Sequence, residues 1–487
     1  MSRCYVACDL GAERGRVILG EFQRDRLTVS EVHRFKNQPV EEKDSLYWDI
    51  ALLYQETLAG LRGVGSYLEP VESISCHSWA GDYLLFDGDG AIITPAYHHR
   101  DPRGQAGRKH VLAKVPGEAI YGETGTQQTA SDTLSQLGAE SSKRLHRAHH
   151  LLPVADAFNF LLAGVPRMEV SLASTTQLYN PATQNWSERV LSALRLPSKL
   201  LPPLVPAGTE LGPLRPEIVK ETGLEDTRVV TTCSHELAAT LAGLPISDGE
   251  SWAFFRPGRT TLMGTQLPEP LINEATGGLN FVNEPVYGGE ICLYKRTAGL
   301  SILEACQRQW EKVDHSLDYG MLTHLAGSAP PFESLINPTD PRFAEPDDMP
   351  QKIAAFCKET KQVVPRKPGP IFRCILESLA LLYRRILQEI EFLTGSAFTR
   401  VYLIGDANNS LLNNFTANAL QIPVVVAPTE AAAIGNILVQ ALALGHIKSV
   451  QEAREIVSNS FKMETILPHA DVWNAAYERM MSLLPEE

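Results

Sequence analysis

A glycine-rich turn near the start of the chain carries residue types that suit phosphate chemistry. It reads Asp9-Leu10-Gly11-Ala12-Glu13-Arg14-Gly15-Arg16 and lies between two segments with the alternating pattern of strands. The backbone N–H groups of such a loop can cradle phosphate oxygens, and Asp9 could hold a hydrated Mg²⁺ ion. The Walker and dinucleotide-binding spacings are absent, so a plain hairpin turn is the simpler alternative.

A second candidate is the tripeptide Ser234-His235-Glu236. It follows a predicted strand, Arg228–Cys233, and opens a predicted helix, Leu237–Ala242. A carboxylate at a strand-to-helix turn is held by the backbone and can act as a general base. The alternative is that Ser234 and Glu236 only cap the helix.

Two further candidate segments contain histidines. His146, His149 and His150 have no further carboxylate or cysteine at ligand spacing, which favours a solvated helix end over a metal site. The segment 97–103 reads Tyr-His-His-Arg-Asp-Pro-Arg and follows a strand. It could bind a polyhydroxylated ligand or form a cluster of ion pairs, and the residues leave both open.

These candidates need elements to position them, and the first half of the chain predicts a mixed α/β start. The expected elements are strands at Cys4–Asp9, Arg16–Phe22 and Arg26–Phe35, a helix at Ser45–Arg62, a strand at Ser73–Ser78, and a hairpin of Tyr83–Phe86 with Ala91–Pro95. The polar turn Asp87-Gly88-Asp89-Gly90 would close that hairpin.

The second half repeats this opening. Two strands, Glu250–Phe255 and Thr260–Thr265, flank Pro257-Gly258-Arg259, and a proline-rich loop is expected over 329–350. A helix at Ile371–Leu393 then leads into a βαβα run formed by a strand at Arg400–Ile404, a helix from Leu411, a strand at Ile422–Ala427 and a helix at Thr429–Leu444. Two α/β domains with similar starts are predicted, with a boundary near 243–250.

Composition excludes several classes of protein. The 487 residues carry a net charge of −13, which argues against a general nucleic-acid binder. No run of 18 apolar residues predicts a membrane span, and Met1–Gly11 predicts a strand rather than a signal peptide. The eight cysteines show no Cys-x-x-Cys pair and suit buried thiols in a reducing cytoplasm.

The motifs together resemble the FGGY carbohydrate kinases, in particular the rhamnulokinase branch. The opening turn is similar to the first phosphate motif of that branch, and Trp79-x-x-Asp82-Tyr83 to its sugar-site strand. Further matches are Arg100-Asp101-x-Arg103, Ser174-Thr175-Thr176-Gln177-Leu178, Ser234-His235-Glu236 in the place of Ser-His-Asp, Leu335-Ile336-Asn337-Pro338 with Asp340 and Arg342-Phe343, Leu411-Leu412-Asn413, Glu430-Ala431 and Gly435-Asn436.

This resemblance implies a fold and an activity. The fold would be α/β, with two ribonuclease-H-like (actin-like) domains, 1–245 on the sugar side and 246–487 on the nucleotide side. The activity would be transfer of the γ-phosphate of ATP, with Mg²⁺, to a hydroxyl of a ketose such as rhamnulose or fuculose. The partners would be a sugar and a nucleotide, without nucleic acid or membrane, and a homodimer is the family expectation.

The resemblance also implies the site residues. The catalytic base would be Glu236, and Asp9 would hold the metal. The sugar-binding residues would be Trp79, Ala80, Asp82, Arg100, His235 and Arg296. The nucleotide-binding residues would be Asp9, Gly11, Glu13, Arg14, Gly15, Arg16, Gly258, Arg259, Glu304, Gly405 and Asn409.

The chain departs from the family pattern at the nucleotide and catalytic positions. Glu13 and Arg14 stand where the family has small hydroxyl residues. Arg256-Pro257-Gly258-Arg259 stands where the family has Ser-Ser-Gly-Thr. The other replacements are Glu236 for Asp, Arg296 for Asn, Glu304 for Gln, His77 for Asp, Ala80 for Gly, and Gly405-Asp406-Ala407 for a triple glycine.

Two outcomes follow from these changes. In the first, the added arginines replace lost backbone contacts to phosphate, and the protein is a kinase with a remodelled donor site. In the second, Arg14, Arg256, Arg259 and Arg296 pair with Glu13, Glu304 and Asp406. The protein would then be a degenerate homologue that binds a sugar or a partner without phosphoryl transfer.

Overall fold

The computed structural model describes residues 3–67, 69–405, 407–469 and 472–484. The chain divides into two compact units that are each discontinuous in sequence. Unit 1 comprises Met1–Asp248, Gln266–Leu293 and Glu430–Lys462, and unit 2 comprises Gly249–Thr265, Tyr294–Thr429 and Met463–Glu487. The predicted boundary at 245/246 stays a prediction.

Unit 1 is built on a six-stranded sheet in the order β14-β15-β6-β1-β2-β3. β1 (Arg3–Leu10), β2 (Arg14–Gln23) and β3 (Arg26–Lys36) form an antiparallel meander, as the sequence predicts. β6 (Val71–Ser78) runs parallel to β1, and β15 (Arg228–Thr231) runs parallel to β6. β14 (Thr209–Pro213) closes the edge in the antiparallel sense. The carboxyl ends of β1, β6 and β15 therefore lie along one edge of the sheet.

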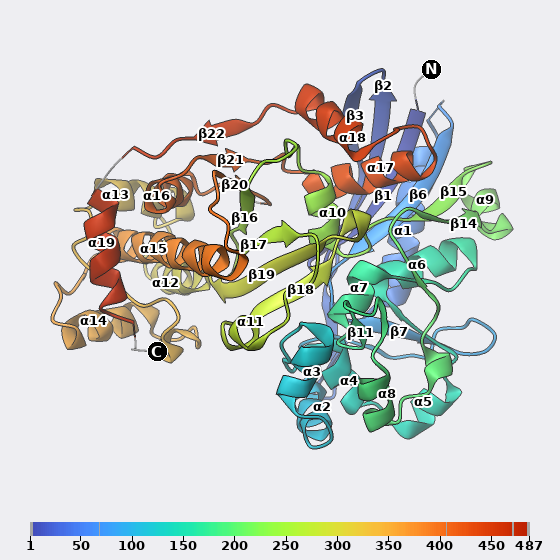
Figure 1. Cartoon of the computed structure of the whole chain (residues 1–487), viewed down its shortest axis with the longest axis horizontal. Coiled ribbons are helices and arrows are strands. Elements are labelled where there is room, and N and C mark those ends of the chain that lie inside the picture. Colours follow the sequence, from blue (N-terminus) through green and yellow to red (C-terminus); the bar gives the residue numbers. More distant parts are fainter. Residues whose placement is uncertain (1–2, 68, 406, 470–471, 485–487) are drawn as a thin grey trace. The chain divides into compact units, whose positions relative to one another are not determined.

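Helices cover both faces of this sheet, and β1 shows why. Its even-numbered residues, such as Val6 and Cys8, pack into a core with α1 (Ile50–Gly65) and α6 (Val154–Ala163). The odd-numbered Tyr5 and Ala7 pack instead against α17 (Ala431–Ala443) and α18 (Val450–Ser460). Figure 1 shows this pairing of distant segments, with α17 and α18 in red beside the blue strands.

A smaller body of elements extends unit 1. It contains a three-stranded sheet of β4 (Pro39–Glu42), β5 (Ser45–Trp48) and β8 (Ala96–Tyr97), and a pair of β7 (Tyr83–Phe86) with β9 (His150–Pro153). Helices α2 (Arg103–Leu112), α3 (Gly117–Thr124) and α4 (Thr133–Gly138), together with α7 (Val170–Thr175) and α8 (Glu188–Leu194), contribute to a second core.

Two local predictions in this region are wrong. The segment Ser45–Trp48 is strand β5 rather than the start of a helix, and α1 begins only after Asp49, whose carboxylate accepts from Leu52 N. Ala91–Pro95 is not a strand, because β7 pairs with β9 and only one bridge, Phe86 to Ile92, joins it to that segment. In both places a partner strand that is distant in sequence decides the outcome.

Unit 2 repeats the plan of the main sheet. Its strands belong to a seven-stranded sheet in the order β18-β19-β17-β16-β20-β21-β22, of which β18 (Phe281–Pro285) is counted with unit 1. β16 (Trp252–Arg256) and β17 (Thr260–Leu267) form an antiparallel hairpin, and β20 (Arg400–Leu403) and β21 (Val424–Val426) continue in parallel from β16. β19 (Ile291–Ala298) lies between β18 and β17, and β22 (Glu464–Ile466) is the edge strand beside β21. The predicted internal repeat is visible as the same strand order, with β3-β2-β1-β6-β15 in unit 1 matching β19-β17-β16-β20-β21 in unit 2.

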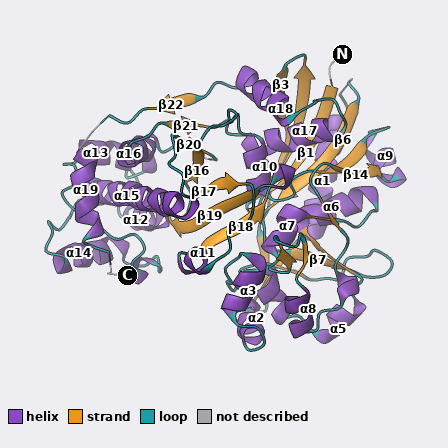
Figure 2. Ribbon diagram, viewed as in Figure 1, coloured by secondary structure: helices purple, strands orange, loops and turns teal. Residues whose placement is uncertain are grey.

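The helices of unit 2 are α12 (Ser301–Glu311), α13 (Tyr319–Ser328), α14 (Met349–Glu359), α15 (Pro368–Thr394), α16 (Ser410–Leu420) and α19 (Val472–Met481). Figure 2 shows these helices around the strands of the unit. Between α13 and α14 the structure contains only a short 3₁₀ turn, Pro341–Phe343, so the loop predicted over 329–350 is largely irregular.

In the described part of the chain, no helix combines the length and apolar composition needed to cross a bilayer. All eight cysteines are buried and free, as predicted. The cytoplasmic location inferred from them stays a prediction.

Candidate active site

Three candidate segments meet at one edge of the unit 1 sheet. Asp9, near the end of β1, pairs in register with His77, near the end of β6. Ser78, the last residue of β6, forms a parallel bridge with His235, which follows β15. Parallel strands bring their carboxyl ends to a common edge, which is where α/β sheets place ligand sites.

Asp9 is held by Arg16 on the neighbouring strand. Arg16 donates from Nε and Nη2 to Asp9 Oδ2 at 2.9 and 2.5 Å, and its Nη1 contacts both oxygens of Glu430 at 2.8 and 2.7 Å. Burial alone would raise the pKa of Asp9, but the interactions with His77 and Arg16 outweigh it and lower this pKa to about 2. Arg16 therefore lies between two carboxylates.

His77 faces the other oxygen of Asp9, and a chain of hydrogen bonds fixes which ring nitrogen carries its proton. The Val6 carbonyl can only accept, so it orients the amide of Gln440, whose Nε2 donates to Val6 O at 2.9 Å and to Asn436 Oδ1 at 2.7 Å. Asn436 Nδ2 must then donate to His77 Nδ1, at 3.1 Å. In the neutral ring the proton lies on Nε2, which is buried and 3.4 Å from Asp9 Oδ1.

These groups do not fit a metal ion held directly by protein carboxylates. A hard cation needs oxygen ligands, whereas Asp9 faces a guanidinium on one oxygen and an N–H on the other. Among the described residues, no group of three or more His, Cys, Asp or Glu could hold a metal ion.

The predicted phosphate loop is a tight turn between β1 and β2. Asn37 closes it by donating from Nδ2 to Gly11 O at 2.9 Å and from its backbone N to Glu13 O at 3.0 Å. A Cβ on Gly15 would lie 2.2 Å from the ring of Phe35, so packing alone requires glycine there. The side chains of Glu13 and Arg14 are exposed.

The sugar-side prediction centres on Asp82, which is almost fully buried. Its Oδ2 accepts from Trp48 Nε1, Trp79 Nε1 and His99 Nδ1, each at 2.7 Å, and its Oδ1 accepts from Gln136 Nε2 at 3.0 Å. Both oxygens of this carboxylate accept hydrogen bonds, and three of the four donors belong to indole or imidazole rings, so Asp82 organises these rings around itself. Sequence reasoning missed Trp48 and Gln136, which come from β5 and α4 and carry no motif.

The other sugar-side residues of unit 1 lie around this cluster. Ala80 is half-buried against the unit 1 core, and the exposed Arg100 donates its backbone N–H to His98 Nδ1 at 2.9 Å. His98 stacks on Trp48, and burial followed by the charge of His99 lowers the pKa of His98 to about 4. Arg103 belongs to an internal ion pair with Glu140 at 3.1 Å. The segment 97–103 therefore contributes both to the Asp82 cluster and to an ion pair.

Buried carboxylates surround the turn that precedes the candidate base. Ser234 donates from Oγ to Asp156 Oδ1 at 2.6 Å and from its backbone N to Glu169 Oε2 at 2.9 Å. His235 donates its backbone N–H to Ser171 Oγ at 3.0 Å, and its Nδ1 bonds to Glu284 Oε1. Ser234 therefore does not cap α10 (Glu236–Ala242) with its side chain, which removes half of the capping alternative.

Burial has the largest effect on the ionisation of the carboxyl groups around Ser234. It raises the pKa of Asp156 well above its ordinary range. It also raises the pKa of Glu169 to about 7, against the opposing hydrogen bonds of Ser171 and Ser234. Asp156, Glu169 and Glu284 were not among the sequence candidates, because isolated acidic residues in apolar segments carry no spacing signal. Glu236, the first residue of α10, is half-buried.

In unit 2 the nucleotide-side candidates lie around the β16–β17 turn. The carbonyls of Gly258 and Arg259 accept from Leu300 N at 2.7 Å and Ser301 N at 3.3 Å, which ties the turn to the start of α12. Arg259 Nη1 pairs with Glu304 Oε2 at 2.7 Å, so one of the pairings predicted for a self-filled donor site is present.

The remaining unit 2 candidates are more dispersed. Gly405 follows β20 with a φ of 83°, and Asp406 lies outside the described residues. Asn409 caps α16 by accepting from Leu412 N at 2.9 Å, and its amide donates to Tyr319 Oη at 2.5 Å. The guanidinium of Arg296 lies 5.7 Å from the centre of the Tyr294 ring.

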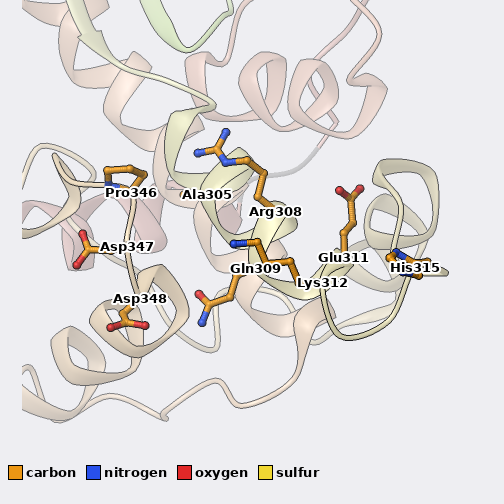
Figure 3. A pocket seen from close by; sticks show the side chains of 9 residues that line it. All are labelled: Ala305, Arg308, Gln309, Glu311, Lys312, His315, Pro346, Asp347 and Asp348. Carbon is orange, nitrogen blue, oxygen red and sulfur yellow. The ribbon is translucent and has the colours of Figure 1, made fainter. Parts of the chain in front are cut away.

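An open pocket of about 670 Å³ lies in unit 2 along α12, one turn beyond Glu304. Figure 3 shows its lining: Ala305, Arg308, Gln309, Glu311, Lys312, His315, Pro346, Asp347 and Asp348. Basic and acidic side chains occur in equal number, so the lining selects no charge class of ligand.

Comparison with known proteins identifies the class to which this fold and site belong. Residues 4–243 match the N-terminal domain, and residues 239–444 the C-terminal domain, of the FGGY family of carbohydrate kinases. The gluconate kinase of Lactobacillus acidophilus and the xylulose kinase of Rhodospirillum rubrum superpose with TM-scores of 0.82, covering 99% of this chain and 98% of each of theirs. At 14% and 17% identity these two structures show the fold alone, and they confirm the predicted actin-like α/β architecture.

Two relatives of similar sequence indicate the branch of the family. A rhamnulokinase of Bacteroides thetaiotaomicron is 36% identical and covers 98% of both chains. A rhamnulokinase of Enterococcus faecalis is 33% identical over 95% of this chain and 94% of its own. The chain belongs to the FGGY family of carbohydrate kinases and is a rhamnulokinase-like, ATP-dependent sugar kinase. The resemblance inferred from the motifs is thereby confirmed.

Proposed function

We propose that this kinase phosphorylates a hydroxyl of a 6-deoxy ketohexose, of the rhamnulose or fuculose type, with Glu236 as the catalytic base. The observation that carries the proposal is the position of Glu236. It opens α10 directly after the carboxyl end of β15, at the sheet edge that also holds Asp9 and Arg16. The rhamnulokinase relatives support the class of sugar.

In the proposed reaction the Glu236 carboxylate accepts the proton of the sugar hydroxyl. The hydroxyl oxygen attacks the γ-phosphorus of ATP, and the bond from that phosphorus to the bridging oxygen breaks, which releases ADP. Phosphoryl transfer depends mainly on positioning and on neutralising charge. Arg16 is the last residue of the predicted phosphate turn, and Asp9 and Glu430 hold its guanidinium in place. We propose that Mg²⁺, where it takes part, is brought on the nucleotide phosphates.

For the sugar we propose the rings that surround Asp82 as the binding wall. The indole of Trp79 and the imidazole of His99 are both fixed by Asp82, and ring faces of this kind pack against the apolar face of a sugar. Asp82 would act through these rings, because its own oxygens are already occupied. We keep the homodimer as an expectation that light scattering can test.

The test is a coupled ADP-release assay over a panel of ketoses and polyols, paired with calorimetric titration of Mg²⁺-ATP. We expect saturable, ATP-dependent phosphorylation of one 6-deoxy ketohexose and micromolar nucleotide binding that tightens with that sugar. Sugar binding without ADP release for any ketose would contradict the proposal and favour the non-transferring homologue.

A further inference from the structure

The imidazole of His235 has a single carboxylate partner, and that partner is deeply buried. Nδ1 of His235 bonds to Oε1 of Glu284, which lies in β18 (Phe281–Pro285) and is 1% exposed. The backbone N–H of His235 is taken by Ser171 Oγ. Among the described residues the ring nitrogen Nε2 of His235 has no hydrogen-bond partner. This nitrogen is not fully buried, so a ligand can reach it.

Glu284 is unfavourable for folding stability at this buried position. Its second oxygen, Oε2, is buried and has no hydrogen-bond partner in the described structure. A buried carboxylate with one unsatisfied oxygen opposes folding, and packing would be served as well by an apolar side chain. Such a group is therefore a candidate for a functional role.

Both partners sit on rigid backbone. Asn283, next to Glu284, exchanges two side-chain hydrogen bonds with the backbone of Leu271, at 2.7 and 3.0 Å, and donates its own N–H to Gly125 O at 2.9 Å. On the other side, Ser78 N donates to Ser234 O at 2.9 Å, which locks the turn onto the end of β6. The distance between Glu284 and His235 is thus set by an anchored strand and an anchored turn.

We propose that Glu284 is a positioning residue of the kinase reaction: it holds the proton of His235 on Nδ1, so that Nε2 accepts a hydrogen bond from a sugar hydroxyl beside Glu236. A carboxylate accepts and cannot donate when ionised, so it selects the Nδ1–H form of the ring. This inference rests on the proposed function, because it assigns the hydroxyl to the sugar substrate of that site.

The first test is a double-mutant cycle of Glu284→Gln and His235→Asn, read as kcat and KM for the sugar and for ATP. Glu284→Gln keeps the shape but allows an amide donor to face Nδ1. We expect it to lower kcat/KM for the sugar by roughly 10- to 100-fold and to leave KM for ATP unchanged. In the His235→Asn background it should cost nothing further, because its effect passes through the imidazole. Glu290→Gln is the matched control, an exposed carboxylate in the segment between β18 and β19.

The second test needs no variant of Glu284 and no activity. Nitrogen-15 NMR of the histidine-labelled full-length protein, with His235→Asn as the assignment control, reports the tautomer at a pH where the ring is neutral. We expect Nδ1 protonated and Nε2 unprotonated. A neutral ring with its proton on Nε2 would overturn the inference, and so would equal losses from Glu284→Gln in both backgrounds. Absence of ketose phosphorylation by the wild type would instead refute the proposed function. The tautomer measurement does not depend on that activity, so the two failures can be told apart.

Discussion

The residues around Asp9 form a site in which hydrogen-bond donors stand where hard ligands for a cation would be needed. Arg16 neutralises one oxygen of Asp9, and the fixed N–H of His77 faces the other. Both donors face carboxylate oxygens of Asp9, so Asp9 has no oxygen left for a directly bound metal ion. The side chain at position 77 therefore decides whether a cation can bind beside Asp9.

The first prediction therefore concerns His77→Asp. It would place a second carboxylate opposite Asp9, and paired carboxylate oxygens are what a divalent cation prefers. We expect electron paramagnetic resonance to detect Mn²⁺ binding by the nucleotide-free variant, and Mn²⁺ to raise its melting temperature. His77→Asn is the uncharged control and should show neither effect. Equal Mn²⁺ binding by wild type and both variants would contradict this description of the corner.

A second prediction concerns the buried carboxyl of Glu169. Its pKa is raised from 4.5 to about 7, so the folded state holds a proton that the unfolded chain releases near pH 4.5. The stability that this proton contributes is complete below pH 4.5 and is lost as the pH rises through about 7. Replacing Glu169 with Gln removes this dependence, which is worth on the order of 3 kcal/mol.

The measurement is urea unfolding of both proteins from pH 4.5 to 8. The difference in free energy of unfolding between Glu169→Gln and wild type should grow in favour of the variant as the pH rises. A constant difference across that range would show that Glu169 is not protonated in the folded state.

At the scale of elements, one close helix crossing holds the candidate base against the sheet. α10, which begins at Glu236, packs on α17, and both helices have glycine at the contact. A Cβ on Gly435 would lie 1.9 Å from the carbonyl oxygen of Ala239, and one on Gly243 would lie 2.2 Å from that of Ala431. Backbone cannot yield as a side chain can, so any larger residue must push the helices apart.

The third prediction follows from this crossing. Gly435→Ala should destabilise unit 1 by about 1–3 kcal/mol and lower kcat, because the displaced α10 carries Glu236. Gly278→Ala is the matched control, since a Cβ there meets nothing within 4 Å. Thermal unfolding and steady-state kinetics measure both effects, and an unchanged melting temperature for Gly435→Ala would contradict the close crossing.

Short sequence patterns predicted the elements whose formation depends on residues close together in the chain. The meander β1–β3, the long helix α15 and the strands β16 and β17 show clear alternation or helical spacing, and the structure has them where they were expected. Ser45–Trp48 was misassigned because its strand state depends on β4 and β8, and β8 lies about fifty residues away. Pairing between distant segments leaves no trace in a short window.

The candidate site divides in the same way. Asp9, Arg16 and Glu236 belong to motifs and were found from the sequence, although their roles stay predictions. Trp48, Gln136 and Glu284 were missed, because each is defined by a hydrogen bond to a residue that is 34 to 54 positions away in the chain. Buried polar partners of this kind become visible only when the fold brings them together.

At the scale of the whole molecule, the two units repeat one strand order, and the family assignment spans both of them. Some departures from the family pattern, such as Arg14 and Arg259, fall on exposed side chains, while the strand order is kept. We therefore expect a kinase whose chemical step depends on the carboxylate at 236, in spite of its longer side chain.

The most direct measurement is single-turnover phosphorylation of the preferred ketose by wild type, Glu236→Gln and Glu236→Asp, with sugar binding followed by calorimetry. Glu236→Gln should still bind the sugar but lose at least 10²-fold in rate, since the amide cannot accept the proton. Glu236→Asp should retain part of the rate, because a carboxylate remains although displaced by about one methylene. Phosphorylation by Glu236→Gln at the wild-type rate would contradict the assignment of Glu236 as the base.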